Sequence, residues 1–323
     1  MSYHALVFCM QSTRIINICI ISALLAILPV KSNAATKKPV ELNKLASHFK
    51  LTSVSQTKNE LIWKTEDSKM VFYPGSRRIT FNEKIFWMNS ATSKKGATWT
   101  VSRTDAETII TPLLLPKNFT KNNPRRVVVL DPGHGGKDSG GVGCHNTYEK
   151  KVVLEISQLV KRNLRNANIA VHMTRDSDKF IELDQRPRLA IRTKADLFVS
   201  IHANKASRVG ANGIETFVMT ACGFASTTSS KADNKSYPGN NNNIYNTILA
   251  SMIHSELLVK TGATDRGVKH ARFKVLKDAT CPATLVEVGF LTNSAEAKKL
   301  ITPAYLDKIA TGITAGILNY LAL

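Results

Sequence analysis

Cysteine and acidic residues are scarce in this sequence, and each shortage excludes a class of protein. Five cysteines occur among 323 residues, and no two form a Cys-x-x-Cys pair. This pattern argues against a thiolate zinc finger and against a disulfide scaffold. Acidic residues number 24 against 44 lysines and arginines, which gives a formal net charge of +20. Such a charge favours polyanionic partners, but no paired recognition elements for DNA or RNA accompany it.

Long apolar runs are also absent, except at the start of the chain. Residues 1–31 contain no acidic residue, and Arg14 precedes an apolar run over 15–30 that leads into a small-residue segment. This order predicts a signal peptide, 1–34, cleaved after Ala34. The alternative is an uncleaved membrane anchor, because the run is nearly long enough to span a bilayer.

Cleavage would remove two positive charges and leave a mature chain, 35–323, with a formal charge of +18. We therefore expect a periplasmic or otherwise secreted, cell-envelope protein without a permanent membrane span. Its charge suits anionic envelope polymers better than nucleic acid, because an exported protein meets the former. A solvated cationic surface without any such partner is the alternative.

Residues 35–124 read as a small β-rich accessory domain and linker. Short apolar runs at 61–63, 70–73 and 85–87 are separated by lysine-, serine- and glycine-rich turns. Such alternation predicts antiparallel strands. A short helix is expected from Asp105 to Leu114. No set of residues typical of a catalytic site occurs in this region, so a purely structural role is an equal alternative.

From residue 125 to 323 the pattern changes to alternating strands and helices. A continuous apolar run at 127–131 predicts a buried parallel strand. Helical spacing follows it over 149–164. The alternation predicts an α/β fold, a mostly parallel twisted sheet with helices on both faces. Further strands are expected at 169–173, 197–201, 214–219 and 283–288, further helices at 183–194 and 244–259, and a mobile surface loop at 226–243.

Polar residues follow or end three of these strands. His134 lies just after the first strand, His202 at the end of the third and Glu287 in the last. Because the carboxyl ends of parallel strands line one crevice, these side chains should meet although 153 positions separate the first from the last. Two converging histidines are typical ligands of zinc.

A catalytic zinc usually has a third protein ligand. Glu149 begins the first helix beside the glycine-rich loop that carries His134, so it faces the same crevice. Glu155 lies two turns further along that helix and is better suited to solvent. Cys144 and His145, in the loop before the helix, are weaker candidates because they are adjacent residues in a flexible loop.

Four ordered segments resemble the zinc-dependent N-acetylmuramoyl-L-alanine amidases, which cut bacterial peptidoglycan. They are VLDPGHGGKD at 129–138, a glutamate 15 residues after the histidine, SIHAN at 200–204 and VEVGFLTN at 286–293. The resemblance spans 125–323. It implies that His134, Glu149 and His202 bind Zn²⁺, that Glu287 is the catalytic carboxylate, and that peptidoglycan is the substrate. It also implies an envelope enzyme of the kind that acts in cell division.

Several alternatives stay open at this point. The same zinc site could serve a carboxypeptidase or endopeptidase of the stem peptides, or the chain could be a non-catalytic wall-binding protein or a cationic adhesin. Arg175, Arg186 and Arg266 could hold substrate carboxylates or form structural ion pairs. Asp131 is expected to support the histidine loop.

One further expectation concerns regulation. Some related amidases cover the zinc with a helical insertion between the second histidine and the glutamate. The serine- and asparagine-rich composition here opposes such a plug.

Overall fold

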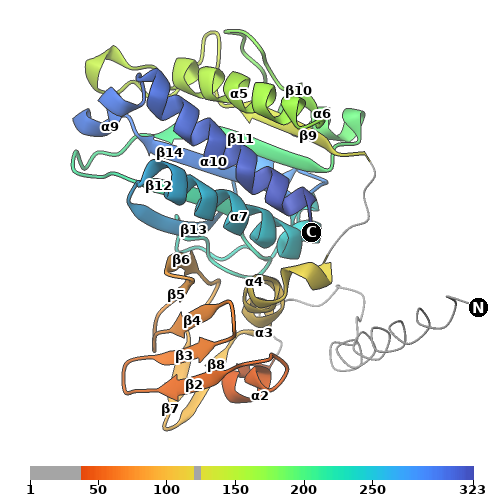
Figure 1. Cartoon of the computed structure of the whole chain (residues 1–323), viewed down its shortest axis with the longest axis vertical. Helices are drawn as coiled ribbons and strands as arrows, with labels where there is room; N and C mark the ends of the chain where they lie inside the picture. The colour runs from red at the N-terminus through yellow and green to blue at the C-terminus, as the bar shows by residue number, and fades with distance from the viewer. Residues whose placement is uncertain (1–37, 120–124) are drawn as a thin grey trace, which may run out of the picture.

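The computed structural model describes residues 38–119 and 125–323. The predicted signal peptide, 1–34, lies outside the described residues. Figure 1 shows two lobes: a smaller one formed by residues 38–119 and a larger α/β lobe formed by residues 125–323. Within these two ranges, no helix combines the length and the apolar character that a bilayer crossing requires.

Short antiparallel strands form most of the small lobe, as the alternating pattern predicted. In β3, Leu61 and Trp63 are buried, whereas Lys64 is exposed. The buried side chains surround Trp63 and Trp99 and include α2 (Leu42–Ala46). The strands are β1 (Val40–Glu41), β2 (Ser53–Gln56), β3 (Leu61–Lys64), β4 (Lys69–Phe72), β5 (Arg78–Phe81), β6 (Lys84–Trp87), β7 (Ser93–Lys95) and β8 (Thr98–Val101).

The helix expected at 105–114 is present and starts two residues earlier. It consists of α3 (Arg103–Asp105), a π-helical turn η2 (Ala106–Ile110) and α4 (Thr111–Leu114), followed by η3 (Pro116–Phe119). Ser102 caps its start, because its Oγ accepts a hydrogen bond from the Asp105 N–H at 3.0 Å.

The large lobe contains a mostly parallel sheet. Strands β10, β9, β11 and β14 run parallel in that order, β12 runs opposite to β14, and β13 runs parallel to β12. Their bounds are β9 (Val127–Pro132), β10 (Ala170–Met173), β11 (Leu197–Asn204), β12 (Ile214–Met219), β13 (Asp265–Ala271) and β14 (Ala283–Phe290).

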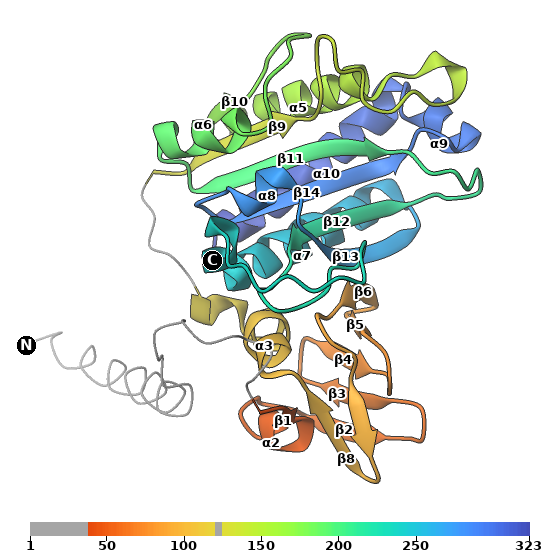
Figure 2. The same ribbon diagram turned by 180° about the vertical axis from the view of Figure 1, so that it is seen from behind.

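Helices cover the two faces of this sheet unequally. Long helices lie over the face seen in Figure 1, and only short ones lie over the face seen in Figure 2. The long helices are α5 (Glu149–Asn166), α7 (Asn243–Thr261) and α10 (Pro303–Leu321), and the short ones are α6 (Gln185–Thr193) and α8 (Lys274–Lys277). We call the thinly covered face the open face. The α/β fold with helices on both faces and a preceding β-rich unit is therefore confirmed.

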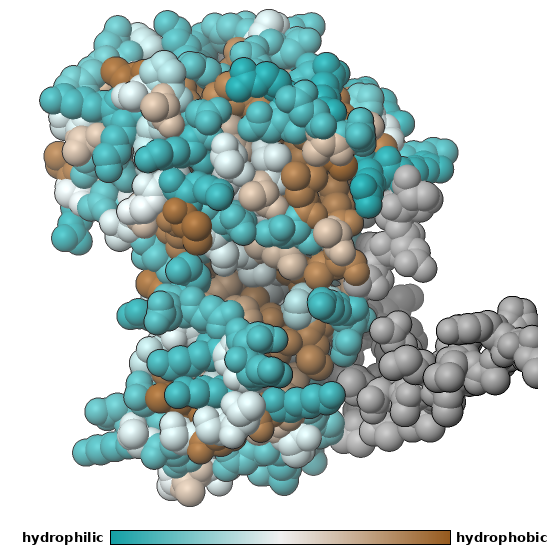
Figure 3. Space-filling view, in the orientation of Figure 1, coloured by the Kyte–Doolittle hydropathy of each residue, from teal (hydrophilic) through white to brown (hydrophobic). Residues whose placement is uncertain are grey.

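One sheet continues through both lobes. Strand β6 of the small lobe pairs in parallel with β13, with Phe86 opposite Val268. The backbone N–H of Ile85 donates to Asp265 Oδ2 at 2.8 Å. Val268 belongs to the same buried cluster as Phe86 and Trp63, so the lobes also share a core. Hydrophobic side chains accordingly gather around the waist of the molecule in Figure 3.

Two expectations about the large lobe were incomplete. Strand β13 was not predicted, because its sequence is largely polar at its start and lacks a continuous apolar run. The loop expected at 226–243 contains a 3-10 turn, η5 (Pro238–Asn242), and the Asn240 side chain donates to the Thr220 carbonyl at 2.8 Å. This segment is thus attached to the end of β12 by its own polar side chains.

Candidate metal centre

Three side chains converge where β9 and β11 end and α5 begins. Glu149 Oε1 lies 3.1 Å from His134 Nε2 and 2.9 Å from His202 Nδ1. One potential ligand atom from each residue lies within 4.8 Å of the others, so together they could hold one metal ion. The loops that carry them gather at the end of the sheet near α9 (Ser294–Lys299), at the right of Figure 2.

The loop around His134 is held in a conformation that few non-glycine residues adopt. Its φ of +58° lies in the left-handed region. The Arg186 guanidinium donates to the His134 carbonyl at 2.9 Å, and Asp138 Oδ2 lies 2.8 Å from His134 Nδ1. Because Nδ1 faces Asp138, Nε2 is left to face the cluster. The sequence pattern alone does not predict this orienting role of Asp138.

Glu149 is anchored by backbone donors as well as by the histidines. Its Oε2 accepts the Gly141 N–H at 2.7 Å, and its Oε1 accepts the Ala203 N–H at 3.2 Å. Burial alone would raise the pKa of Glu149, but the hydrogen bonds and charges of His134 and His202 bring it far below its usual range. Glu149 is therefore a carboxylate in the folded protein. The same carboxylate, with Asp138, raises the pKa of His134 despite the opposing effect of burial.

Glycines lie against the histidines of the cluster at positions where a Cβ atom would not fit. A Cβ at Gly133 would lie 2.3 Å from His202 Cε1, and one at Gly140 would lie 2.6 Å from His134 Cδ2. Two imidazole nitrogens and one carboxylate oxygen, packed this closely, match the donor set of a catalytic zinc site that keeps an open position. The residues present thus fit zinc.

Glu287 lies beside this cluster on β14, directly in register with His202 on β11. Its Oε2 is buried and makes no hydrogen bond to any described residue. Burial raises the pKa of Glu287 well above its usual value, and the nearby carboxylates of Glu149 and Glu215 add to the increase. A carboxyl group in this environment can hold a proton near neutral pH.

The two arginines of the loop region have structural contacts. Arg175 donates to the carbonyls of Pro132 and Gly133 at 3.0 and 2.6 Å. Arg186 pairs at 2.9 Å with Asp131, whose other oxygen accepts a hydrogen bond from the Ser200 hydroxyl at 2.7 Å. These contacts fix the loop that carries His134. They match the expectation that Asp131 supports this loop.

The weaker ligand candidates lie elsewhere. Glu155 is exposed on α5. His145 Nε2 lies 3.0 Å from Ser294 Oγ, and Cys144 Sγ is 3.5 Å from the Thr292 carbonyl. Neither belongs to the metal-type cluster found among the described residues.

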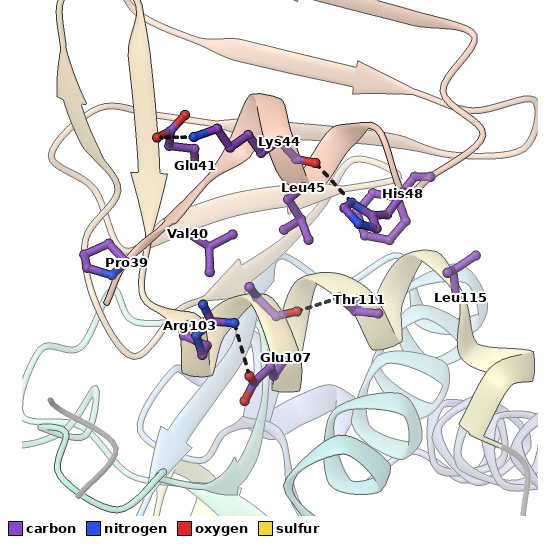
Figure 4. Close-up of a pocket in the computed structure, with 12 residues that line it drawn as sticks. Pro39, Val40, Glu41, Lys44, Leu45, His48, Arg103, Glu107, Thr111 and Leu115 are labelled. Carbon is purple, nitrogen blue, oxygen red and sulfur yellow. Dashed lines mark hydrogen bonds and ion pairs between the residues drawn. The ribbon is translucent and has the colours of Figure 1, made fainter. Parts of the chain in front are cut away.

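A cavity of about 310 Å³ lies far from the cluster, in the small lobe between α2 and α3–α4 (Figure 4). Two pairs of opposite charge lie along it: Lys44 with Glu41 at 2.9 Å and Arg103 with Glu107 at 3.9 Å. The cavity is mainly apolar and lacks a converging ligand set. Side-chain chemistry therefore places the candidate centre at His134, Glu149 and His202 rather than at this cavity.

Known proteins are similar to the part of the chain that contains these three residues. The family model described as N-acetylmuramoyl-L-alanine amidase matches residues 128–319. The amidase AmiA of Escherichia coli is 34% identical over 225 residues, covering 62% of this chain and 78% of AmiA. The amidase LytC of Bacillus subtilis is 36% identical over 193 residues, covering 60% of this chain and 35% of LytC.

Solved structures of N-acetylmuramoyl-L-alanine amidases are also similar to this chain. The catalytic domain of CwlV, an amidase of Bacillus (Paenibacillus) polymyxa, is 35% identical with a TM-score of 0.52, covering 61% of this chain and 98% of the domain. The amidase AmiC2 of Nostoc punctiforme is 33% identical with a TM-score of 0.53, covering 62% of this chain and all of that structure. The family model covers more than half of the chain. The chain therefore belongs to the N-acetylmuramoyl-L-alanine amidase family, hydrolases that cut the amide bond between N-acetylmuramic acid and L-alanine in peptidoglycan.

Proposed function

We propose that His134, Glu149 and His202 hold a zinc ion and that Glu287 transfers the proton during amide hydrolysis. The observation that carries this proposal is the convergence of the three ligand types with an unpartnered buried carboxyl oxygen beside them. When bound, zinc acts as a Lewis acid that polarises the substrate carbonyl and lowers the pKa of water.

The residues around the proposed zinc site then have separate roles. Glu287 accepts a proton from the attacking water and returns it to the departing nitrogen of L-alanine. Its raised pKa suits both directions of transfer, since the group must be a base first and an acid afterwards. Asp138 orients His134, and the N-terminal turn of α5 positions Glu149. Arg175 and Arg186 keep the loop rigid, which maintains the ligand geometry.

We propose that residues 1–34 direct export, that 35–124 form the accessory unit with its linker, and that 125–323 form the catalytic domain. The mature charge of +18 suits an envelope site with peptidoglycan and anionic polymers, not nucleic acid. In this proposal the enzyme is periplasmic or otherwise secreted.

The proposed enzyme needs no activator to uncover the zinc. The long helix between His202 and Glu287 is α7, which packs against α10 on the helical face rather than over the cluster. Purified protein that is inactive until a partner is added would contradict this part of the proposal.

Peptidoglycan digestion tests the function. Residues 35–323, loaded with zinc, should release stem peptides that begin with L-alanine and leave peptide-free glycan strands, as identified by mass spectrometry. Glu287→Gln is the matched control, because it keeps the shape of the side chain and removes the titratable oxygen. Products cut within the stem peptide, with the muramoyl bond intact, would instead identify a carboxypeptidase or endopeptidase.

A further inference from the structure

Beside Glu287, one buried carboxylate is shared by two cations. Glu215 on β12 lies directly opposite Glu287 in the antiparallel register of β12 and β14. Glu215 Oε1 accepts hydrogen bonds from Arg266 Nε at 2.5 Å and from Lys269 Nζ at 2.8 Å. Both cations belong to β13, the strand that was not predicted. The three side chains together carry one net positive charge.

The two cations retain donors that the protein does not use. The Nη2 of Arg266 has no hydrogen-bond partner in the part of the chain that the structure describes, and its Nη1 only reaches the Asn212 carbonyl at 3.5 Å. Of the three N–H groups of the Lys269 ammonium, one donates to Glu215. The side chain of Arg266 is 34% exposed and that of Lys269 is 18% exposed, whereas that of Glu215 is 6% exposed. The excess positive charge therefore faces solvent.

The Arg266 guanidinium is also held in place. It lies over the ring of Phe290 at 4.8 Å from the ring centre. Stacking of this kind reduces the number of conformations that the side chain must give up when a ligand binds. The unused edge of its fork matches a carboxylate geometrically.

The position of Arg266 and Lys269 relative to the scissile bond determines which carboxylate of the substrate can contact them. His202, Glu287 and Glu215 are register neighbours on β11, β14 and β12, and Lys269 is paired with Phe217 two residues beyond Glu215. Paired residues, and residues two apart, share a face of a sheet, so all four lie on the open face. Strand β13 is two strands from β14, or about 10 Å, because neighbouring strands are about 4.8 Å apart. Long side chains on β13 can thus reach a group about two residues along a bound peptide.

We propose that Arg266 and Lys269 bind a free carboxylate on the second residue of the stem peptide. This inference rests on the proposed function, because it takes the bond to L-alanine to lie beside Glu287. It assigns a direction to the substrate: the stem peptide crosses the open face from β14 towards β13. The cation pair then selects substrates with a free carboxylate over those with an amide at this position.

Two synthetic disaccharide–peptides test the proposal, one with the carboxylate and the other with the carboxamide at residue two. For the zinc-loaded wild type, we expect a kcat/KM about tenfold higher for the carboxylate substrate. Lys269→Met should reduce this ratio to within about twofold of unity, and Arg266→Met should reduce it similarly. Lys308→Met removes the same charge from exposed α10 on the other face and should leave the ratio unchanged.

Binding gives a second measurement that does not require turnover. Zinc-loaded Glu287→Gln should bind the carboxylate ligand more tightly than the amide in calorimetry, and Lys269→Met in the same background should bind both equally. Equal cleavage of both substrates by the wild type, or a preference kept in both cation variants, overturns the carboxylate site and leaves the proposed function standing. Cleavage of neither substrate overturns the proposed function, and this inference with it.

Discussion

Asp105 in the small lobe is a fully buried carboxyl group, Glu287 in the large lobe is a half-buried one with a buried Oε2, and their surroundings differ. Burial raises the pKa of each, although hydrogen bonds from Ser102, Asn89 and the Ser90 backbone partly offset the effect for Asp105. Both Asp105 oxygens accept hydrogen bonds, whereas Glu287 Oε2 has no partner among the described residues. Burial alone therefore does not distinguish a catalytic acid from a structural one, and the proposal for Glu287 rests on its unpartnered oxygen beside the ligand cluster.

Exchanging the two groups for their amides gives the largest expected effects. Glu287→Gln should reduce muropeptide release by about 10³-fold, since general acid–base catalysis typically contributes 10²–10⁴-fold. Its free energy of unfolding should not decrease, because the amide removes a buried ionisable group. Asp105→Asn should keep activity per folded molecule and lose about 1–3 kcal/mol of stability, because one of its two acceptor oxygens becomes an NH₂ group that faces buried donors. Urea unfolding measures the stability of both variants, and product release measures their activity. A Glu287→Gln variant that is stable and fully active would contradict the proton-transfer role proposed for Glu287.

The junction between the lobes provides a pH test. His270 on β13 donates from Nε2 to the Trp87 carbonyl at 2.6 Å. Burial, with the charges of Arg77 and Arg272, lowers the pKa of His270 to about 4. The unfolded chain takes up a proton below about pH 6.5, whereas the folded chain resists it until about pH 4. Stability should therefore fall by up to about 3 kcal/mol as the pH drops through this window.

His270→Gln should flatten that dependence in urea unfolding between pH 7 and 4.5. The exposed His172→Gln is the control and should leave the slope of the wild type intact. An unchanged slope in His270→Gln would show that another group produces the acid sensitivity.

Glycines of the two lobes offer a smaller contrast. Gly133→Ala places a Cβ against the His202 ring, so zinc affinity and activity should fall, the latter by about a hundredfold. Gly75→Ala in the small lobe meets no atom within 4 Å, but its φ of +69° strains an alanine. It should lose about 1 kcal/mol of stability and keep full activity. Chelator competition and thermal unfolding separate the two effects, and equal zinc affinity in Gly133→Ala would contradict the packing argument.

Much of this arrangement can be predicted from the residues. Apolar runs that end in His202 or contain Glu287 define strand ends, and the rule for parallel sheets brings them together. The pairing of β6 with β13 could not be predicted, because β13 is polar where it meets Ile85 and a single residue pair joins the strands. The roles of Asp138 and Glu215 depend on tertiary distances, which spacing along the chain does not encode.

Metal content tests the central claim most directly. Residues 35–323, purified with zinc and dialysed, should retain about one zinc per chain by elemental analysis, as the three-ligand site requires. His202→Ala should lose the metal and the amidase activity together, whereas His172→Ala should retain both. Zinc bound at full stoichiometry in His202→Ala, with amidase activity preserved, would contradict the account.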